Sequence, residues 1–280
     1  MNDKFSSIKS NILAFAENNE SVEAVIAIGS STRSEMKADE FSDLDLLIAT
    51  DDAESWLYGD IPHKFGEVKI SFVEPTLGGG KERRILYKNA LDVDMIVFTP
   101  SQLTEVVQTG VAGWVCNRGY TVMHDSMGIS ELLAEYVKPE IGYNPPSEAE
   151  FINIVNDFSF HTIWAYKKLI RGEMWSAKMC IDAYLKNYLL KIIEMYCNKK
   201  YNVDVWHDGR FLDKWADERI KASLRKCFSR YNKSDIKTAL LETKALFDDL
   251  AKSSADLMGY QFPKKAVSYA DEILSEYNKR

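Results

Sequence analysis

Two aspartates stand at the head of an apolar run, in the order Asp43, Leu44, Asp45, Leu46. If this run is a strand, residues two apart point to the same face, so the two carboxylates lie together while the leucines face the other way. Like charges held this close are costly unless a cation lies between them. Because Mg²⁺ favours carboxylate and phosphate oxygens, the spacing predicts a magnesium site at Asp43 and Asp45.

A third carboxylate for this site can come from the run 91–98, which carries two more aspartates at the same spacing. Asp92 and Asp94 would share one face of that strand, and either could complete the metal site. We choose Asp94 as the third ligand because the apolar run follows it directly.

A Gly-Ser pair, Gly29 and Ser30, follows the apolar run 22–28. Glycine lets the backbone approach a triphosphate closely, and serine offers a backbone N–H and a hydroxyl to its outer oxygens. An Asp-X-Asp by itself is more often a solvated strand end than a metal site. The combination of Gly-Ser, Asp-X-Asp and a later acidic strand is more specific, and it indicates metal-dependent chemistry on a phosphate-bearing ligand.

These residues need a sheet to position them, and the hydrophobic pattern supplies one. Apolar residues at helical spacing predict a lead-in helix within residues 1–19. Short β-branched or leucine-rich runs, separated by Gly, Pro, Asp or Asn, then predict strands of a mixed sheet at 22–28, 44–49, 68–73, 84–87 and 91–98.

The pattern changes at the segment 142–147, because Pro145-Pro146 can continue neither a helix nor a strand. Ser147 and Glu150 have the spacing of a capping box at a helix start. We therefore predict a sheet domain at 1–146 and a helical domain at 147–280. Helical patterns in the second domain cover roughly 148–171, 173–197, 210–216, 217–230, 234–258 and 263–279. The predicted fold class is α+β, a mixed-sheet domain followed by an all-α helical bundle.

The net charge of −7 is unevenly distributed along the 280 residues. Residues 1–146 contain 23 acidic and 12 basic side chains, whereas residues 147–280 contain 19 and 23. An acidic first part is a poor surface for nucleic acid, whose binding draws its affinity from Lys and Arg. It suits cations, either metal ions or a polyamine-like substrate, although charge alone more often means a solvated acidic surface.

The sequence lacks the features of a secreted or membrane protein. Polar residues interrupt its N-terminal segment and no stretch of about 18 apolar residues occurs, so we expect a cytoplasmic protein that does not enter the membrane. Its four cysteines are widely spaced, with no Cys-X-X-Cys pair, which argues against a zinc site and against a disulfide framework.

The Gly29-Ser30 and Asp43-X-Asp45 pattern resembles the signature of the nucleotidyltransferase superfamily related to DNA polymerase beta. Further residues resemble the bacterial aminoglycoside 6-adenylyltransferases, the streptomycin-modifying family, over nearly the whole chain; they are the run 39–45, Glu150-Phe151, Asn156-Asp157-Phe158, Arg171-Gly172-Glu173 and Leu189-Leu190. The resemblance implies a polymerase-beta-like nucleotidyltransferase domain, a helical substrate-binding domain, and ATP and Mg²⁺ as cosubstrate and cofactor. It further implies transfer of AMP to the 6-position hydroxyl of a streptomycin-like aminoglycoside, with release of pyrophosphate and resistance to the antibiotic.

The resemblance also implies roles for six residues: Asp43, Asp45 and Asp94 would hold the metal, and Gly29, Ser30 and Arg33 would bind the triphosphate. Arg33 departs from the family pattern. Some members have Gly-Ser-Arg, whereas two residues stand between Ser30 and Arg33 in this chain.

A general base would take the proton of the acceptor hydroxyl. Relatives carry an acid one turn earlier in the helix 173–197, where this chain has Met179, so Asp182 is the nearest carboxylate. The alternative interpretation of Asp182 is a helix acid beside Lys178 and Lys186, at i−4 and i+4. The metal-binding carboxylates are the other candidates for the base.

Ammonium or guanidinium groups of such an acceptor need carboxylates and aromatic faces. Our candidates are Asp157 in the first helix of the second domain, and Trp206 and Asp208 in the connection after the second helix. His161 has no partner that is visible in the sequence. Two other functions stay open: modification of another small molecule such as a lincosamide, and a non-catalytic nucleotide-binding interaction module.

Overall fold

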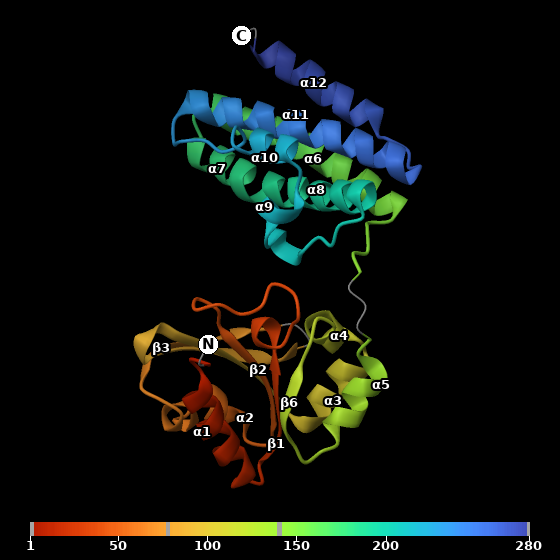
Figure 1. The fold of residues 1–280 in the computed structure, drawn as a ribbon. Coiled ribbons are helices and arrows are strands. Elements are labelled where there is room, and N and C mark those ends of the chain that lie inside the picture. Colours follow the sequence, from red (N-terminus) through yellow and green to blue (C-terminus); the bar gives the residue numbers. More distant parts are fainter. Residues whose placement is uncertain (1–2, 77–78, 139–141, 279–280) are drawn as a thin grey trace. The chain divides into compact units, whose positions relative to one another are not determined.

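The computed structural model describes residues 3–76, 79–138 and 142–278. The chain divides into two compact units, Met1–Ile141 and Gly142–Arg280 (Figure 1). The first unit contains a mixed sheet with helices, and the described part of the second contains helices and loops, so the predicted α+β fold class is confirmed. Among the described helices, none combines the length and the apolar character that a membrane span requires.

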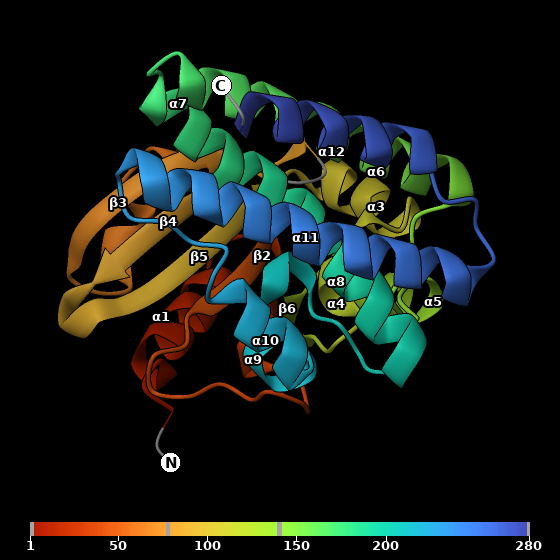
Figure 2. The same cartoon turned by 90° about the horizontal axis from the view of Figure 1, so that it is seen from above.

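The first unit is built around a six-stranded sheet with the strand order β3-β4-β5-β2-β1-β6. All neighbouring strands are antiparallel except β2 and β5, which are parallel, as expected of a mixed sheet. Figure 2 shows β3, β4 and β5 next to one another. The strands are β1 (Val22–Ile28), β2 (Leu44–Thr50), β3 (Val68–Pro75), β4 (Lys81–Tyr87), β5 (Leu91–Phe98) and β6 (Thr121–Asp125).

The strand β6 was not predicted from the sequence. It is an edge strand that pairs with β1, and its residues are exposed or only partly buried. A strand that packs so little apolar surface carries neither a continuous apolar run nor a clean alternation, and therefore gives a weak hydrophobic pattern.

The central strand β2 is buried on both faces, which explains its nearly continuous apolar run. Leu44, Leu46 and Ile48 belong to one core cluster, and Leu47 and Ala49 belong to the cluster on the opposite face. The first cluster includes residues of α1 (Ser6–Glu17) and α2 (Ala53–Leu57), and the second includes residues of α3 (Pro100–Gln108), α4 (Val111–Cys116) and α5 (Ile129–Tyr136). Helices on both faces fix the sheet, and so they fix the start of β2 where the aspartates lie.

The second unit begins with a capping box, as the sequence predicts. The Ser147 N–H donates to Glu150 Oε2 (2.8 Å), and the Glu150 N–H donates to Ser147 Oγ (3.4 Å). The segment before this helix packs with the same unit, since the Tyr260 hydroxyl donates to the carbonyl oxygen of Pro146 (3.2 Å). The helices are α6 (Glu148–Ile170), α7 (Met174–Met179), α8 (Lys186–Tyr201), α9 (Leu212–Trp215), α10 (Glu218–Leu224), α11 (Lys233–Met258) and α12 (Lys264–Asn278).

The core of the second unit forms where α11 packs against α8 and α6. Phe158 of α6 and Phe247 of α11 are fully buried, and their rings stack with centroids 3.6 Å apart. Between α7 and α8 the chain makes a π-helical segment, η5 (Cys180–Leu185). The helix predicted at 173–197 is therefore interrupted by a π turn, and it continues to Tyr201, where Asn202 takes a left-handed conformation that ends it.

Candidate active site

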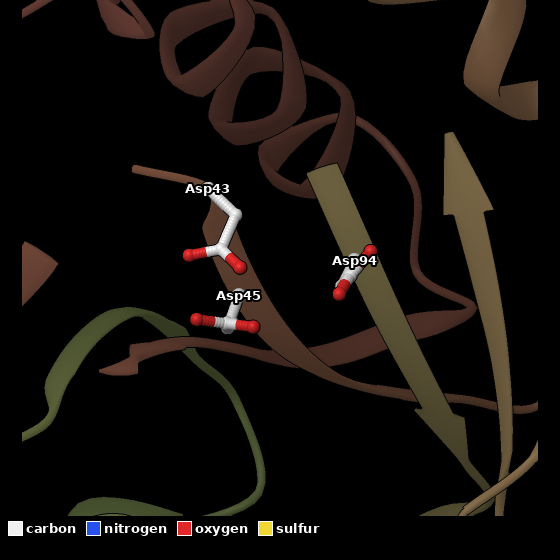
Figure 3. A group of neighbouring side chains, drawn as sticks. All are labelled: Asp43, Asp45 and Asp94. Carbon is white, nitrogen blue, oxygen red and sulfur yellow. The ribbon is translucent and has the colours of Figure 1, made fainter. Parts of the chain in front are cut away.

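The structure brings Asp43, Asp45 and Asp94 together into what we call the acidic cluster. One carboxylate oxygen of each residue lies within 4.8 Å of the others. Asp45 and Asp94 are register partners on the parallel strands β2 and β5, and Asp43 directly precedes β2 (Figure 3). Asp92 is exposed and lies two register pairs away from Asp94, opposite Leu86 of β4. The geometry therefore places Asp94, and not Asp92, in the cluster.

Asp94 is the most deeply buried member of the acidic cluster, with 5% of its surface exposed. Burial raises the pKa of Asp94 to about 8, and the charges of Glu82, Asp45 and Asp92 add to the rise, while Arg84 opposes it. Three carboxylates in a partly desolvated site are stabilised by a bound cation, which removes the repulsion between them.

Two polar atoms at this site are buried without a hydrogen-bond partner among the described residues. They are Oδ1 of Asp94 and Oγ of Ser30. Buried polar atoms normally have partners, so these two oxygens fit a ligand that the chain itself does not supply. Because the acidic cluster offers only carboxylate oxygens, it fits Mg²⁺ better than a softer metal.

Gly29 lies against the acidic cluster. Its φ is +70°, and a Cβ atom at this position would lie 2.2 Å from Oδ2 of Asp45. A side chain is therefore excluded both by the left-handed backbone and by the carboxylate. The absence of a side chain at Gly29 lets the Asp45 carboxylate lie directly against the backbone of the Gly29-Ser30 turn.

Local hydrogen bonds hold the turn that carries these residues, η1 (Gly29–Ser31). Ser31 Oγ donates to the Ile28 carbonyl oxygen (3.2 Å), and Thr32 Oγ1 donates to the carbonyl oxygen of Gly119 (2.9 Å). The Ser30 carbonyl oxygen accepts the N–H of Ala38 (3.0 Å). These hydrogen bonds hold the turn to the segments on either side of it, and so they fix the position of Ser30.

Arg33 lies in the loop after this turn, where its Nε donates to the carbonyl oxygen of Met36 (2.6 Å). A second arginine, Arg84 of β4, was not singled out from the sequence. Its Nη2 lies 3.5 Å from Asp94 Oδ2, and its Nε lies 3.0 Å from Glu82 Oε1. The sequence shows that Glu82 and Arg84 share a face of a strand, but only the pairing of β4 with β5 places Arg84 opposite Asp94.

Asp157, Asp182, Trp206 and Asp208 all lie in the second unit. The Asp157 carboxylate accepts hydrogen bonds from His161 Nδ1 (2.7 Å), the Tyr184 hydroxyl (3.0 Å) and the Tyr188 hydroxyl (3.1 Å). His161 therefore does have a partner, and a spacing of four residues along α6 could have indicated it.

Asp182 lies in the π-helical segment η5, where one of its oxygens pairs with Lys178 Nζ (2.5 Å). Lys178 also donates to the carbonyl oxygen of Ser229 (2.7 Å). The structure thus shows the i,i+4 ion pair that was the alternative interpretation of Asp182.

Trp206 is 4% exposed, and its ring meets that of Phe211 edge to face. It is therefore a packing residue of the connection between α8 and α9, because a ring buried to this degree offers no face to a ligand. Asp208 is exposed in the short turn His207–Gly209, and its charge adds to a rise in the pKa of Glu194.

A sheet whose parallel strands bring aspartates together beside a Gly-Ser turn defines the nucleotidyltransferase class of enzyme. The family model described as streptomycin adenylyltransferase matches residues 4–277, and the chain belongs to this family. No curated protein matches the chain.

Two solved structures are similar over most of the chain. An aminoglycoside 6-adenyltransferase from Bacillus subtilis is 17% identical, with 98% of this chain and 99% of that chain covered and a TM-score of 0.45. A nucleotidyltransferase-like protein from Exiguobacterium sibiricum 255-15 is 12% identical, with 91% and 78% covered and a TM-score of 0.34.

Proposed function

We propose that this protein transfers AMP from ATP to a hydroxyl of an aminoglycoside, with the 6-position of streptomycin as the acceptor. The observation that carries the proposal is the acidic cluster beside the Gly29-Ser30 turn, with oxygens of Asp94 and Ser30 buried and unpartnered among the described residues. Family membership supports the adenylyl donor and the acceptor class.

In this proposal the turn and the acidic cluster divide the work of binding ATP. The backbone at Gly29 and the hydroxyl of Ser30 orient the triphosphate. Asp43, Asp45 and Asp94 hold Mg²⁺, which when bound would neutralise the charge that develops on the phosphate oxygens. Arg33 remains a candidate for a contact with the outer phosphates once its side chain leaves the carbonyl oxygen of Met36.

The acceptor hydroxyl attacks the α-phosphorus in line, the new P–O bond forms, and the bond to pyrophosphate breaks. The proton of the hydroxyl passes to a carboxylate oxygen of the acidic cluster, and we assign it to Asp94, whose Oδ1 has no hydrogen-bond partner among the described residues. We prefer Asp94 to Asp182 in this role because Asp182 is already paired with Lys178.

The experiment that tests the proposal is pyrophosphate release by the purified protein with ATP and Mg²⁺. Four reactions are compared: streptomycin, kanamycin, lincomycin and no acceptor. We expect release with streptomycin alone, and mass spectrometry of the product should show one added AMP. If only lincomycin causes pyrophosphate release, the acceptor is a lincosamide. If none of the three antibiotics causes release, the proposed transfer is contradicted.

A further inference from the structure

The helical unit contains an open cavity of about 690 Å³, and four of its nine lining residues are aromatic. Six of its lining residues matter here: His161, Trp164, Trp175, Met179, Tyr184 and Asn187, which together we call the aromatic cavity. They come from α6, α7, the π-helical segment η5 and α8, which follow one another in the chain (Figure 1).

Several large apolar side chains that line the aromatic cavity are exposed to solvent. Trp175 is 68% exposed, and Met179 and Tyr184 are also exposed. Lys168 Nζ lies 5.2 Å from the ring centroid of Trp164, but in the described part of the chain no lysine or arginine lies over Trp175. The face of Trp175 is thus available to a planar or cationic group from solution.

The Asp157 carboxylate, 24% exposed, accepts hydrogen bonds from His161 and Tyr184, which line the cavity. Its three donors are two phenols and an imidazole, and no lysine or arginine of the described residues pairs with it. The pKa of Tyr184 lies above its usual value, first because of its hydrogen bond with Tyr188, then because of burial and its bond to Asp157. These donors fix the carboxylate in place.

Two other acids in this part of the helical unit have lysine or arginine partners. Asp182 is paired with Lys178, and Glu173 is paired with Lys168 and Arg171. Asp157, whose nitrogen partner is His161, therefore differs from these acids in having no lysine or arginine partner among the described residues. A carboxylate next to aromatic faces attracts a cation.

The hydrogen-bond pattern of Asp157 favours a forked donor. The hydroxyl of Tyr184 is shared between the two carboxylate oxygens, at 3.0 Å from Oδ1 and 3.1 Å from Oδ2. That shared position is the one a guanidinium takes when it donates two parallel N–H groups to a carboxylate. A guanidinium reaches this position when a change in the Tyr184 side-chain torsions moves the hydroxyl oxygen aside, because rotation of the O–H bond alone leaves that oxygen in place.

We propose that the aromatic cavity binds a guanidinium group of the acceptor, with Asp157 as its counter-ion and Trp175 and Tyr184 as the faces on which it stacks. This rests on the proposed function for the nature of the acceptor, because streptomycin carries guanidinium groups whereas kanamycin carries only amines. A planar, weakly hydrated cation fits aromatic walls and a bidentate carboxylate better than a compact ammonium does.

The test is calorimetric titration of the full chain, without ATP, using streptomycin and kanamycin as probes. The variant Asp157→Asn keeps the size of the side chain and removes its charge, so streptomycin should bind about 10- to 100-fold more weakly. Trp175→Ala changes an exposed residue that the core does not need, and it should also weaken binding. Tyr184→Phe keeps the wall and removes the competing hydroxyl, so its affinity should equal or exceed that of the wild type.

The control is Asp256→Asn, which removes an exposed acid of the same unit that does not line this cavity, and it should leave the affinity for streptomycin unchanged. Unchanged binding by both Asp157→Asn and Trp175→Ala would overturn the proposal. An equal loss of kanamycin affinity in these two variants would also overturn it, because the cavity would then recognise positive charge in general and not the guanidinium group.

A parallel assay of adenylylation separates this inference from the proposed function. Wild-type transfer to streptomycin with an unchanged KM in Asp157→Asn would overturn the cavity assignment and leave the function standing. The opposite result is also possible: the wild type binds streptomycin but transfers no AMP, and Asp157→Asn loses the binding. That result would support the cavity assignment and contradict the proposed function.

Discussion

Asp94 bears most of the electrostatic cost of the acidic cluster, because it is the most buried of three carboxylates that approach within 4.8 Å. The side chains around it are a mixture of opposing charges: Asp45 and Glu82 raise its pKa, and Arg84 lowers it. A cluster of this kind is unfavourable in the metal-free protein and favourable once a divalent cation is bound. Removal of one acid from the cluster should therefore lower the activity and raise the stability of the metal-free protein.

We expect Asp45→Asn to lower the rate of AMP transfer at least about 100-fold, as removal of one charge-stabilising group from an active site does. The same change should raise the melting temperature of the metal-free protein, since one of the repelling charges is gone. Pyrophosphate release and thermal unfolding measure the two effects. Asp92→Asn is the matched control, and wild-type turnover in Asp45→Asn would refute the metal-site assignment.

Gly29→Ala should impair the site through two separate effects. A left-handed backbone costs an L-residue roughly 1–2 kcal/mol, and the new Cβ would lie 2.2 Å from the Asp45 carboxylate. Gly110→Ala is the matched control, because Gly110 has a φ of +80° and no atom within 4 Å of the added Cβ. Both variants should lose stability, but only Gly29→Ala should raise the KM for ATP; similar KM values in the two would count against the phosphate-binding role.

Asp182→Asn distinguishes a structural acid from a catalytic base. Because Asp182 pairs with Lys178, we expect a lower melting temperature and a turnover within a few-fold of the wild type. A fall in kcat of about 100-fold, with the fold intact, would instead restore Asp182 as the general base.

At the scale of elements, pairing between strands assembles the candidate site and helix boundaries shape the helical unit. β2 and β5 are parallel and in register at Asp45 and Asp94, so the alternation of each strand directs both acids to one face. In the helical unit the π-helical segment η5 carries Tyr184 and α8 carries Tyr188, and both hydroxyls reach Asp157 on α6. Each cluster therefore joins elements that are separate in the sequence.

The helix α8 also carries an acid whose titration should affect stability. Burial raises the pKa of Glu194 to about 7, and the charge of Asp208 adds to the rise. The folded state then holds a proton that the unfolded chain has lost between the ordinary glutamate pKa and about 7, so the stability contribution of Glu194 falls as pH rises through this range.

Glu194→Gln should consequently stabilise the protein at pH 8, by roughly 1–2 kcal/mol after allowance for the exposed part of the side chain, and should change little at pH 4.5. Urea unfolding at the two pH values measures the difference. Asp208→Asn should produce a smaller change in the same direction, and an equal effect of Glu194→Gln at both pH values would contradict the burial of this carboxyl.

At the scale of the whole molecule, two compact units have separate cores and separate charge characters. The sheet unit concentrates acidic side chains, which suits a metal ion, whereas the helical unit has an excess of basic residues and yet keeps Asp157 free of a lysine or arginine partner among the described residues. The two units therefore offer separate binding chemistry to the substrates.

Because the helical unit has its own core, a fragment of residues 142–280 should fold without the sheet unit. Circular dichroism should show a helical spectrum and a cooperative thermal transition, as expected of a single domain of this size. A gradual, non-cooperative transition would mean that the helical core depends on the rest of the chain.

The sequence by itself determined the features that depend on local order. Alternation placed Asp43 and Asp45 on one face of a strand, the capping box at Ser147 marked the start of α6, and the predicted strands at 22–28 and 91–98 coincide with β1 and β5. Periodicity and capping act over a few residues, so they can be read directly from the chain.

Only the tertiary structure decided which strands are neighbours and which side chains are buried. The pairing of β5 with both β2 and β4 selects Asp94 over Asp92 and places Arg84 beside it. Likewise Trp206 packs against Phe211 and not toward solvent, and Asp182 takes Lys178 as its partner. Strand pairing and burial join residues far apart in the chain, and their free energy depends on all the packed surfaces at once, which no local pattern encodes.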